Sequence, residues 1–215
     1  MFDWGSNALH ELLRTDTLDF EHAKTKIHRP AMFNNTDELI TRLMTSRPYH
    51  KAVIFTDNAG ADVTLGVLPF ARYLIQCGTN VILAPNSQPA INDITEPELL
   101  ALLTKVQRID PVIRDAIKAK QLAVYGTGSS SPCLDLRRID ERLVRHSRDA
   151  DLVVIIGMGR AIHTNFYARF NCDVVKMAVF KNFMAAQVVG AHIYDAMCLF
   201  TPKSADTRIM DGAPS

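Results

Sequence analysis

From Lys51 onward, short runs of apolar residues alternate with longer segments in which apolar residues recur at helical spacing. This alternation is typical of a mostly parallel sheet whose connecting helices cover it. We therefore expect a doubly wound α/β fold with helices on both faces, that is, a Rossmann-like α/β/α arrangement. The six predicted strands are "KAVIFTD", "NVILAP", "LAVYG", "DLVVII", "VVKMAVF" and "AHIYDAMCLF".

The predicted helices carry recognisable terminal residues. Thr95 and Glu98 have the spacing of a capping box, and Asp110 precedes a proline at another helix start. A helix is also predicted from about residue 61 to residue 77, and Pro69 should kink or split it. These signals place the helices between the predicted strands.

The ends of the chain differ in pattern from its centre. Short helices are predicted over the first fifty residues, where Asn35 and Glu38 match a capping box and Trp4 is expected to anchor the segment. The tail, residues 203–215, is polar and rich in small residues, so we expect it to be loosely ordered. We predict one domain over residues 1–202, with a helical lead-in (1–50) and an α/β core (51–202).

The charge balance of the sequence indicates which class of partner to expect. With 24 basic and 23 acidic residues among 215, no charge excess favours nucleic acid or an anionic membrane, so a small molecule is the expected partner. Every apolar run is shorter than the roughly 18 to 20 residues that span a bilayer, and no signal peptide is evident, so we expect a cytoplasmic protein. The four cysteines lack the spacing of a zinc site or a disulfide framework.

Polar or glycine-bearing segments follow five of the predicted strands. They are "TDNAGAD", "APNSQPAINDIT", "YGTGSSSP", "GMGRAIHTN" and "KN". In an open parallel sheet the carboxyl ends of the strands meet at one edge, where loops and helix starts form the ligand crevice. We therefore expect the functional site at that edge.

Asp57, Asn58 and Asp93 offer oxygen atoms as ligands, which suit a hard divalent ion such as Mg²⁺ or Mn²⁺. Such an ion keeps water on its other positions, and this leaves room for a phosphate. Gly60 permits a sharp turn, and Asp62 in the following helix is placed to receive a proton or orient a water. Taken singly, these residues could instead cap a helix or form a turn. Their occurrence at two strand ends favours the metal site.

Two further segments are candidates for phosphate contacts. Gly128 and Ser129 belong to "GTGSSS", whose backbone N–H groups could cradle an anion, although a flexible polar loop would have the same composition. Lys181 directly follows the fifth strand and could supply a point charge at the crevice. The alternative is a solvent-exposed lysine at the end of a strand.

The segment "GMGRAIHTN" begins like a dinucleotide-binding fingerprint but departs from it. Ile162 occupies the third glycine position, the segment follows the fourth strand, and no acidic residue stands about 20 residues further on. We therefore reject NAD binding. Arg160, His163 and Asn165 remain candidate contacts to phosphate or substrate, with a role in loop structure as the alternative.

Six blocks of the sequence, in order, resemble the metal-dependent damage-control phosphatases. The resemblance is to the 4'-phosphopantetheine phosphatase subfamily found at the C-terminus of vertebrate pantothenate kinase 4 and of plant pantothenate kinases. It covers residues 2 to about 202 through "FDWGS", "YHKAVIFTDNAGAD", "GTNVILAPNSQPAINDIT", "GTGSSSPCLDL", "DLVVIIGMGRAIHTN" and "MAVFKN".

This resemblance implies an enzyme that hydrolyses a small-molecule phosphomonoester. The implied substrates are 4'-phosphopantetheine and its oxidised forms, whose removal would limit their entry into coenzyme A synthesis. A divalent ion (Mn²⁺, Co²⁺, Ni²⁺ or Mg²⁺) would be held by Asp57, Asn58 and Asp93. Asp62 and Lys181 match the acidic and lysine positions of the subfamily.

The sequence departs from the subfamily at Ile156, where a glutamate is usual, and it starts at "FDWG", ahead of which the subfamily usually has a helical region. We therefore keep two alternatives open: a phosphatase of broader sugar-phosphate range, and a catalytically weak binding or regulatory homologue. Attack by a metal-activated water and formation of an aspartyl phospho-enzyme both fit the residues. The sequence gives no indication of the oligomeric state.

Overall fold

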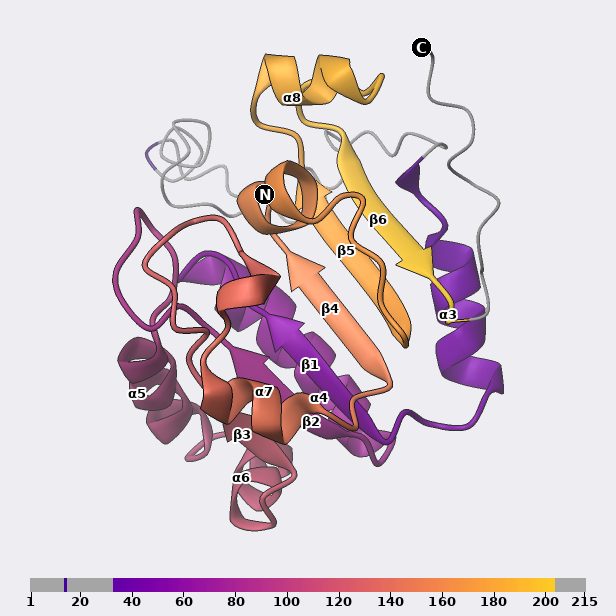
Figure 1. Cartoon of the computed structure of the whole chain (residues 1–215). Helices are drawn as coiled ribbons and strands as arrows, with labels where there is room; N and C mark the ends of the chain where they lie inside the picture. Colours follow the sequence, from indigo (N-terminus) through magenta and orange to yellow (C-terminus); the bar gives the residue numbers. More distant parts are fainter. Residues whose placement is uncertain (1–13, 15–32, 204–215) are drawn as a thin grey trace.

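The computed structural model describes residue 14 and residues 33–203, and the predictions for Trp4, for most of the lead-in and for the tail beyond residue 203 lie outside these ranges. Six strands form one sheet in the order β3-β2-β1-β4-β5-β6. All neighbours are parallel except β6, which runs antiparallel to β5 (Figure 1). The strands are β1 (Lys51–Phe55), β2 (Asn80–Ala84), β3 (Leu122–Val124), β4 (Leu152–Ile156), β5 (Asp173–Val179) and β6 (Ala196–Thr201).

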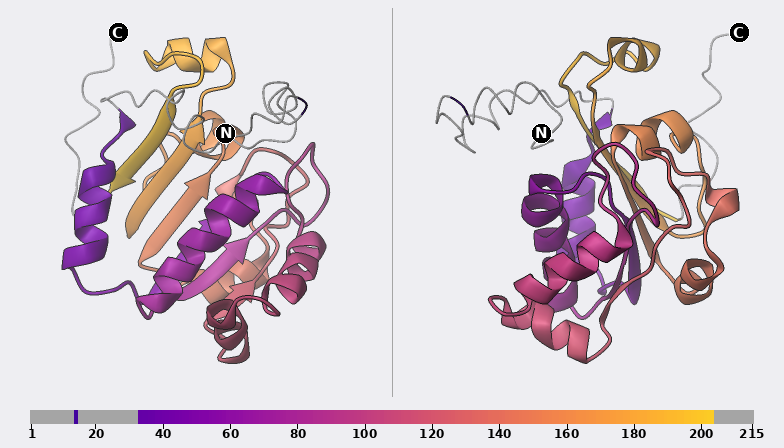
Figure 2. Two further views of the ribbon diagram at one scale, coloured as in Figure 1. Left: turned by 180° about the vertical axis from the view of Figure 1, so that it is seen from behind. Right: turned by 90° about the vertical axis from the view of Figure 1, so that its left-hand side faces the viewer.

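Helices cover both faces of the sheet, as Figure 2 shows when the sheet is seen edge-on. One face packs against α3 (Thr36–Thr45), the π-helix η2 (Asp62–Val67), α4 (Leu68–Gln76), α5 (Glu96–Val106) and α6 (Pro111–Lys118). The other carries the 3₁₀ turn η3 (Leu136–Arg138), α7 (Glu141–Ser147), the π-helix η4 (Met158–Thr164) and α8 (Phe183–Val188). The predicted doubly wound α/β fold is confirmed.

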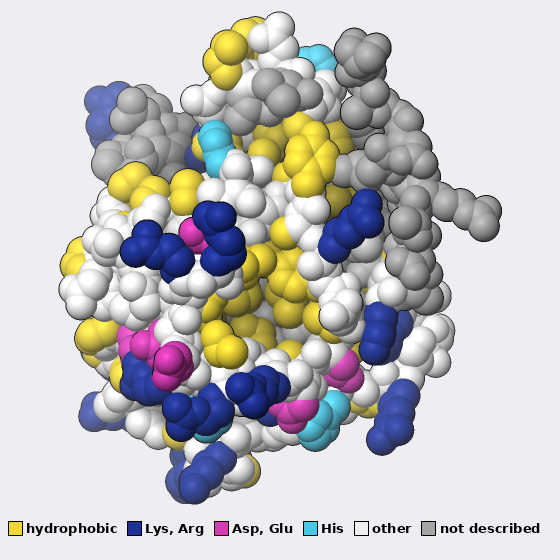
Figure 3. Space-filling model, in the orientation of Figure 1, with side chains coloured by type: hydrophobic (Ala, Val, Ile, Leu, Met, Phe, Trp, Pro, Cys, Tyr) yellow, Lys and Arg dark blue, Asp and Glu magenta, His cyan; other side chains and the backbone are white. Residues whose placement is uncertain are grey.

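The position of β1 inside the sheet explains why its sequence is a continuous apolar run. In β1, Ile54 points into the core on the α4 side, whereas Val53 and Phe55 point into the core on the α7 side. A strand buried on both faces cannot alternate apolar with polar residues. On the α7 side, hydrophobic side chains show at the floor of a hollow over the sheet (Figure 3).

Two of the predicted helix starts are confirmed. Thr95 and Glu98 form both hydrogen bonds of a capping box at α5, and the Asp110 carboxylate accepts from two backbone N–H groups at the start of α6. The segment that contains Pro69 is split, because the π-helix η2 gives way to α4 at Leu68. Proline at the start of a helix loses no hydrogen bond, so the division falls there.

α3 begins directly after Asn35, as predicted, but the predicted capping box is not formed there. The Asn35 side chain does not cap α3; it donates to the Phe200 carbonyl and accepts from the Phe200 N–H, each at 2.7 Å. This pairing ties the start of α3 to the edge strand β6. The final predicted strand is also too long, because residues 191–195 form a turn in which Tyr194 has a positive φ of 68°.

Candidate active site

The sheet order reverses between β1 and β4, which are neighbours although far apart in sequence. Ligands of open α/β sheets bind outside the carboxyl ends of the strands at such a reversal. The segment after β1 begins with Thr56 and Asp57, and the segment after β4 begins with Gly157. The crevice between them is therefore the first place to look for a site.

The loops after β1 and β2 are joined by backbone hydrogen bonds. Asn58 and Asp93 form an antiparallel bridge, and the Ile94 N–H donates to the Asp57 carbonyl at 2.9 Å. The structure thus brings Asp57, Asn58 and Asp93 together, as the strand-end argument predicted. Asp62 lies beside them, because the Asn58 amide donates to its carboxylate at 2.6 Å.

Arg160 lies between the two carboxylates and is fully buried, with no exposed surface. Its Nη1 donates to Asp57 Oδ1, and its Nη2 donates to Asp93 Oδ2 at 2.6 Å. The residue belongs to the first turn of η4, which begins directly after Gly157. One guanidinium therefore bridges residues that follow β1 and β2, and we refer to Asp57 and Asp93 as the acid pair.

Asn86 is a member of this group that the sequence did not single out. Its Oδ1 accepts from Arg160 Nη2 at 3.0 Å, and its Nδ2 donates to Asp93 Oδ2 at 3.1 Å and to the Ser131 carbonyl at 3.0 Å. The available signal was its place in "APNSQPAINDIT", two residues beyond the end of β2.

Burial dominates the electrostatics of Asp57. It raises the pKa of Asp57 to about 6, although the charge of Arg160 opposes this rise. Asp93 raises the same pKa further, whereas Lys181 lowers it, so the Lys181 charge acts within the site. A carboxyl group with a pKa near 6 exchanges its proton close to neutral pH, which is typical of functional sites.

The donor set fits a hard divalent ion. Asp57 and Asp93 each accept a hydrogen bond from Arg160 through one carboxylate oxygen. The Asn58 amide nitrogen donates to Asp62, so the Asn58 amide oxygen points away from Asp62. Within residues 33–203, no three His, Cys, Asp or Glu side chains cluster closely enough to hold a metal ion. The set of two carboxylates and one amide oxygen is of the kind that Mg²⁺ and Mn²⁺ accept.

The loop that contains Gly128 and Ser129 is organised by its own hydroxyl groups. Thr127, Ser129 and Ser131 each accept a hydrogen bond from the backbone N–H two residues further on, at 3.0 to 3.2 Å. The Gly128 N–H donates to Ser87 at 2.7 Å. These N–H groups are thus engaged within the protein, so the loop offers hydroxyl hydrogens rather than the predicted cradle of backbone N–H groups.

These hydroxyl groups line a cavity of about 410 Å³, which we call the hydroxyl recess. Arg138 contributes to its wall, and so do Ser131 and Cys133, the two neighbours of Pro132. Asn86 binds the Ser131 carbonyl there, and Arg160 Nη1 lies 3.4 Å from the Pro132 carbonyl. The hydroxyl-bearing residues of the recess are Thr127, Ser129, Ser130, Ser131 and Thr164.

The other two predicted substrate contacts, His163 and Asn165, lie at the end of η4. His163 is exposed on η4, and Asn165 is buried at its end. The Asn165 amide donates to the carbonyls of Leu134 and Arg160, each at 2.9 Å. Asn165 therefore supports the backbone of Arg160, and in the described part of the chain no hydrogen bond joins either residue to the acid pair.

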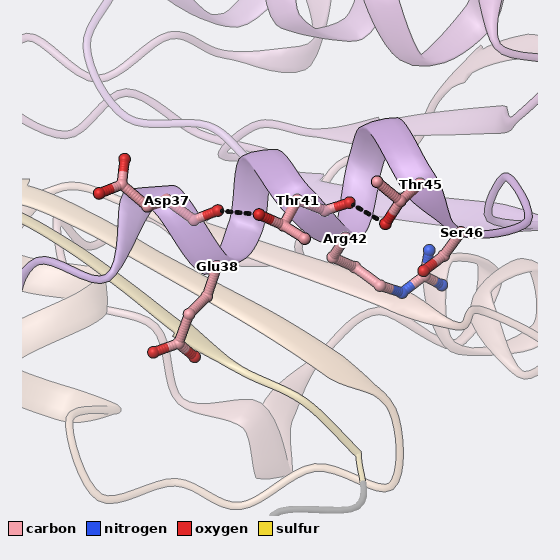
Figure 4. Close-up of a pocket in the computed structure, with 6 residues that line it drawn as sticks. All are labelled: Asp37, Glu38, Thr41, Arg42, Thr45 and Ser46. Carbon is pink, nitrogen blue, oxygen red and sulfur yellow. Dashed lines mark hydrogen bonds between the residues drawn. The ribbon is translucent and has the colours of Figure 1, made fainter.

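A second cavity, of about 440 Å³, lies along α3 (Figure 4), which contacts β6 at the edge of the sheet. Its walls come from a single helix and the residue after it. The hydroxyl groups of Thr41 and Thr45 bond backbone carbonyls one turn earlier in that helix. Several elements meet at the acid pair, whereas this cavity is lined by one helix and the residue after it.

Comparison with known proteins gives the family. Residues 1–197 match the family described as "Damage-control phosphatase ARMT1-like domain". The chain belongs to this family. The resemblance seen in the six sequence blocks is thereby confirmed.

Three relatives align with almost the whole chain. They are pantothenate kinase 2 of Oryza sativa subsp. japonica (35% identical, 94% of this chain, 25% of the relative), 4'-phosphopantetheine phosphatase of Mus musculus (36%, 92%, 30%) and a damage-control phosphatase of Arabidopsis thaliana (37%, 93%, 54%). The chain therefore spans between a quarter and about half of the length of these relatives.

A solved structure supports the fold of this damage-control phosphatase domain. It is a DUF89 family protein from Pyrococcus horikoshii, 17% identical, with a TM-score of 0.56 over 89% of this chain and 57% of that one. No helix in the described ranges is long and apolar enough to cross a membrane.

Proposed function

We propose that the chain is a metal-dependent phosphomonoesterase that hydrolyses 4'-phosphopantetheine and its oxidised forms. Family membership and the name of the mouse relative support the reaction and the substrate. The observation that carries the proposal is the acid pair bridged by Arg160 at the reversal of the sheet order. In the cytoplasm this activity would keep damaged intermediates out of coenzyme A synthesis.

The divalent ion would be held by Asp57, Asn58 and Asp93. When bound, it would neutralise phosphate oxygens and lower the pKa of a coordinated water. Mg²⁺ and Mn²⁺ suit oxygen ligands of this kind, and Co²⁺ and Ni²⁺ are the other ions that the family resemblance implies. Arg160 would hold the two carboxylates in place, since its guanidinium already bonds both.

The other site residues would act on the phosphate ester itself. Lys181 would attract the anionic substrate, because its charge already acts on Asp57. Asp62, hydrogen-bonded to Asn58, would accept a proton from the attacking water or orient that water. The loop of Gly128 and Ser129 would hold the alcohol portion of the ester in the hydroxyl recess.

His163 and Asn165 would have indirect roles in this scheme. Asn165 supports the Arg160 carbonyl, so it would stabilise η4 rather than touch the substrate. His163, exposed on the same π-helix, would meet only a substrate that extends beyond the crevice. These roles follow from where the two side chains lie.

A phosphatase of broader sugar-phosphate range is a second candidate. It is favoured by the hydroxyl recess, because serine and threonine side chains can hydrogen-bond a sugar as readily as a pantetheine chain. The two candidates share the acid pair and the proposed metal. They differ in the alcohol that the recess would accept.

The test is phosphate release by the purified protein, stripped of metal and then supplied with Mg²⁺, Mn²⁺ or Co²⁺. We expect activity with 4'-phosphopantetheine that depends on the added metal and exceeds that with a panel of sugar phosphates. Asp57→Ala should abolish it. Asp149→Ala is the matched control, because Asp149 is an exposed aspartate paired with Lys51 at the start of β1. Activity that survives in Asp57→Ala would refute the metal assignment.

A further inference from the structure

Asn86 is a buried polar residue to which the proposed reaction gives no role. It is 1% exposed. Its backbone N–H donates to the Ile94 carbonyl at 3.1 Å, and its own carbonyl accepts from the Glu96 N–H at 2.8 Å. The residue is thus fixed against the segment that carries Asp93 and begins α5.

The partners of its side chain determine how the amide is oriented. Oδ1 faces a donor, Arg160 Nη2, whereas Nδ2 faces two acceptors, Asp93 Oδ2 and the Ser131 carbonyl. A flipped amide would set a donor against the guanidinium and an acceptor against the carboxylate and the carbonyl. Asn86 therefore fits in one orientation only, and in it both of its N–H bonds are used.

Arg160 depends on this contact because its other attachments are few. Nε is buried and has no hydrogen-bond partner in the described part of the chain, so the guanidinium is held through its two terminal nitrogens. Nη1 is held by Asp57 and lies 3.4 Å from the Pro132 carbonyl, and Nη2 is shared between Asn86 and Asp93. Asn86, Arg160 and Asp93 thus form a closed triangle of hydrogen bonds.

We propose that Asn86 is a positioning residue for the acid pair and for the hydroxyl recess together. By fixing Arg160 and Asp93 relative to each other it would orient the acid pair toward a divalent ion, and it holds the Ser131 carbonyl of the recess wall at a fixed place beside them. This inference rests on the proposed function. Without the amide, Asp93 Oδ2 would lose one of its hydrogen-bond donors, and the Ser131 carbonyl would lose the donor that Asn86 supplies.

The experiment compares the wild type with Asn86→Ala and Asn86→Ser. Serine keeps a polar group but is too short to reach Arg160 and Ser131 together. The matched control is Asn80→Ala, since Asn80 lies at the opposite end of β2 and its side chain donates to the His50 carbonyl. The measurements are the Mn²⁺ dissociation constant of the metal-free protein by titration calorimetry, kcat and KM, and the melting temperature without metal.

We expect Asn86→Ala and Asn86→Ser to bind Mn²⁺ about tenfold more weakly and to lose about 10- to 100-fold in kcat, because residues that orient metal ligands have effects of this size. Asn80→Ala should match the wild type in both. If Asn86→Ala does not fold, Asn86→Ser alone decides the question. Mn²⁺ affinity and kcat within twofold of wild type in a folded variant would overturn the proposal.

The Mn²⁺ titration also separates this inference from the proposed function. If the wild type binds Mn²⁺ but releases no phosphate, the proposed reaction fails, and the loss of affinity in the Asn86 variants still supports the positioning role. If the wild type is active and the Asn86 variants are unchanged, the reaction stands and the positioning role is refuted.

Discussion

The carboxylate of Asp57 lies directly against the α-carbon of Gly157. A β-carbon added to Gly157 would overlap the carboxyl carbon and both carboxylate oxygens of Asp57. Gly157 also has a φ of 102°, which side chains rarely adopt. Since β1 and β4 are adjacent at the reversal of the sheet order, the first residue after β4 must be small for Asp57 to enter the crevice.

We expect Gly157→Ala to displace Asp57 and to reduce phosphatase activity by about 100-fold or more, because a shift of about 1 Å in a reacting group can cost that much. Mn²⁺ affinity, measured by calorimetry, should fall with it. Gly66→Ala is the control, because a β-carbon added to Gly66 would meet no atom within 4 Å. Equal activity in the two variants would show that the close contact is unimportant.

Mn²⁺ binding should weaken as the pH falls below about 6. Burial raises the pKa of Asp57 to about 6 in the metal-free protein, so at lower pH the ion must displace a proton from its ligand. The apparent affinity should then fall by up to about tenfold per pH unit. Calorimetry at pH 5, 6 and 7.5 in buffers of different ionisation enthalpy should find about one proton released at pH 5. Affinity that is constant over this range would contradict the assignment of Asp57.

Because of Lys176, we expect the free energy of unfolding to depend on pH in the alkaline range. Burial lowers its pKa to about 8, and its ammonium group donates to the carbonyls of Phe166 and Ala168 at 2.7 and 3.0 Å. Below pH 8 both the folded and the unfolded chain hold the proton. Between about pH 8 and 10 only the unfolded chain does, so this residue makes the free energy of unfolding rise with pH.

Urea denaturation from pH 7 to 10 measures this effect as the difference between the wild type and Lys176→Met. The difference cancels the contributions of other groups, such as Cys172, whose pKa is raised by burial. Methionine should be less stable throughout, because the two carbonyls lose their donor. Parallel pH profiles for the two proteins would mean that the folded pKa of Lys176 is not depressed.

Much of the fold could be predicted because burial on both faces leaves an unambiguous pattern. Runs such as "LVVII" are apolar throughout, and their positions in the sequence fix the strands to within a few residues. The direction of β6 could not be predicted in this way. It depends on the turn at residues 191–195, where the Asp195 carboxylate accepts from the His192 N–H at 2.7 Å.

The candidate site could be predicted where its residues stand at strand ends. Asp57, Asn58 and Asp93 follow β1 and β2 and meet through the backbone bridge between their loops. For Asn86 the place beyond β2 was the one signal, and it was not enough, because the role of this residue depends on Arg160, which lies 74 positions away in the sequence. Nor does local spacing reveal that η2 and η4 are π-helices, since this depends on how their neighbours pack.

The isoleucine before Gly157 gives the last prediction. Ile156 ends β4, pairs with Met177 and is half-buried against the core on the α4 side, so the acid pair assembles without a carboxylate at this position. We therefore expect the wild type to be active. Ile156→Glu should tighten Mn²⁺ binding several-fold relative to Ile156→Gln, because affinity for hard cations rises with the negative charge around the site.

Glutamine has nearly the size and shape of glutamate without its charge, so the comparison isolates the charge from the loss of apolar packing. Both variants should melt below the wild type, because each places a polar group against apolar neighbours. Phosphate release and Mn²⁺ calorimetry on the three proteins give the answer. A wild type that is inactive beside an active Ile156→Glu variant would mean that Ile156 has converted a phosphatase site into a binding site.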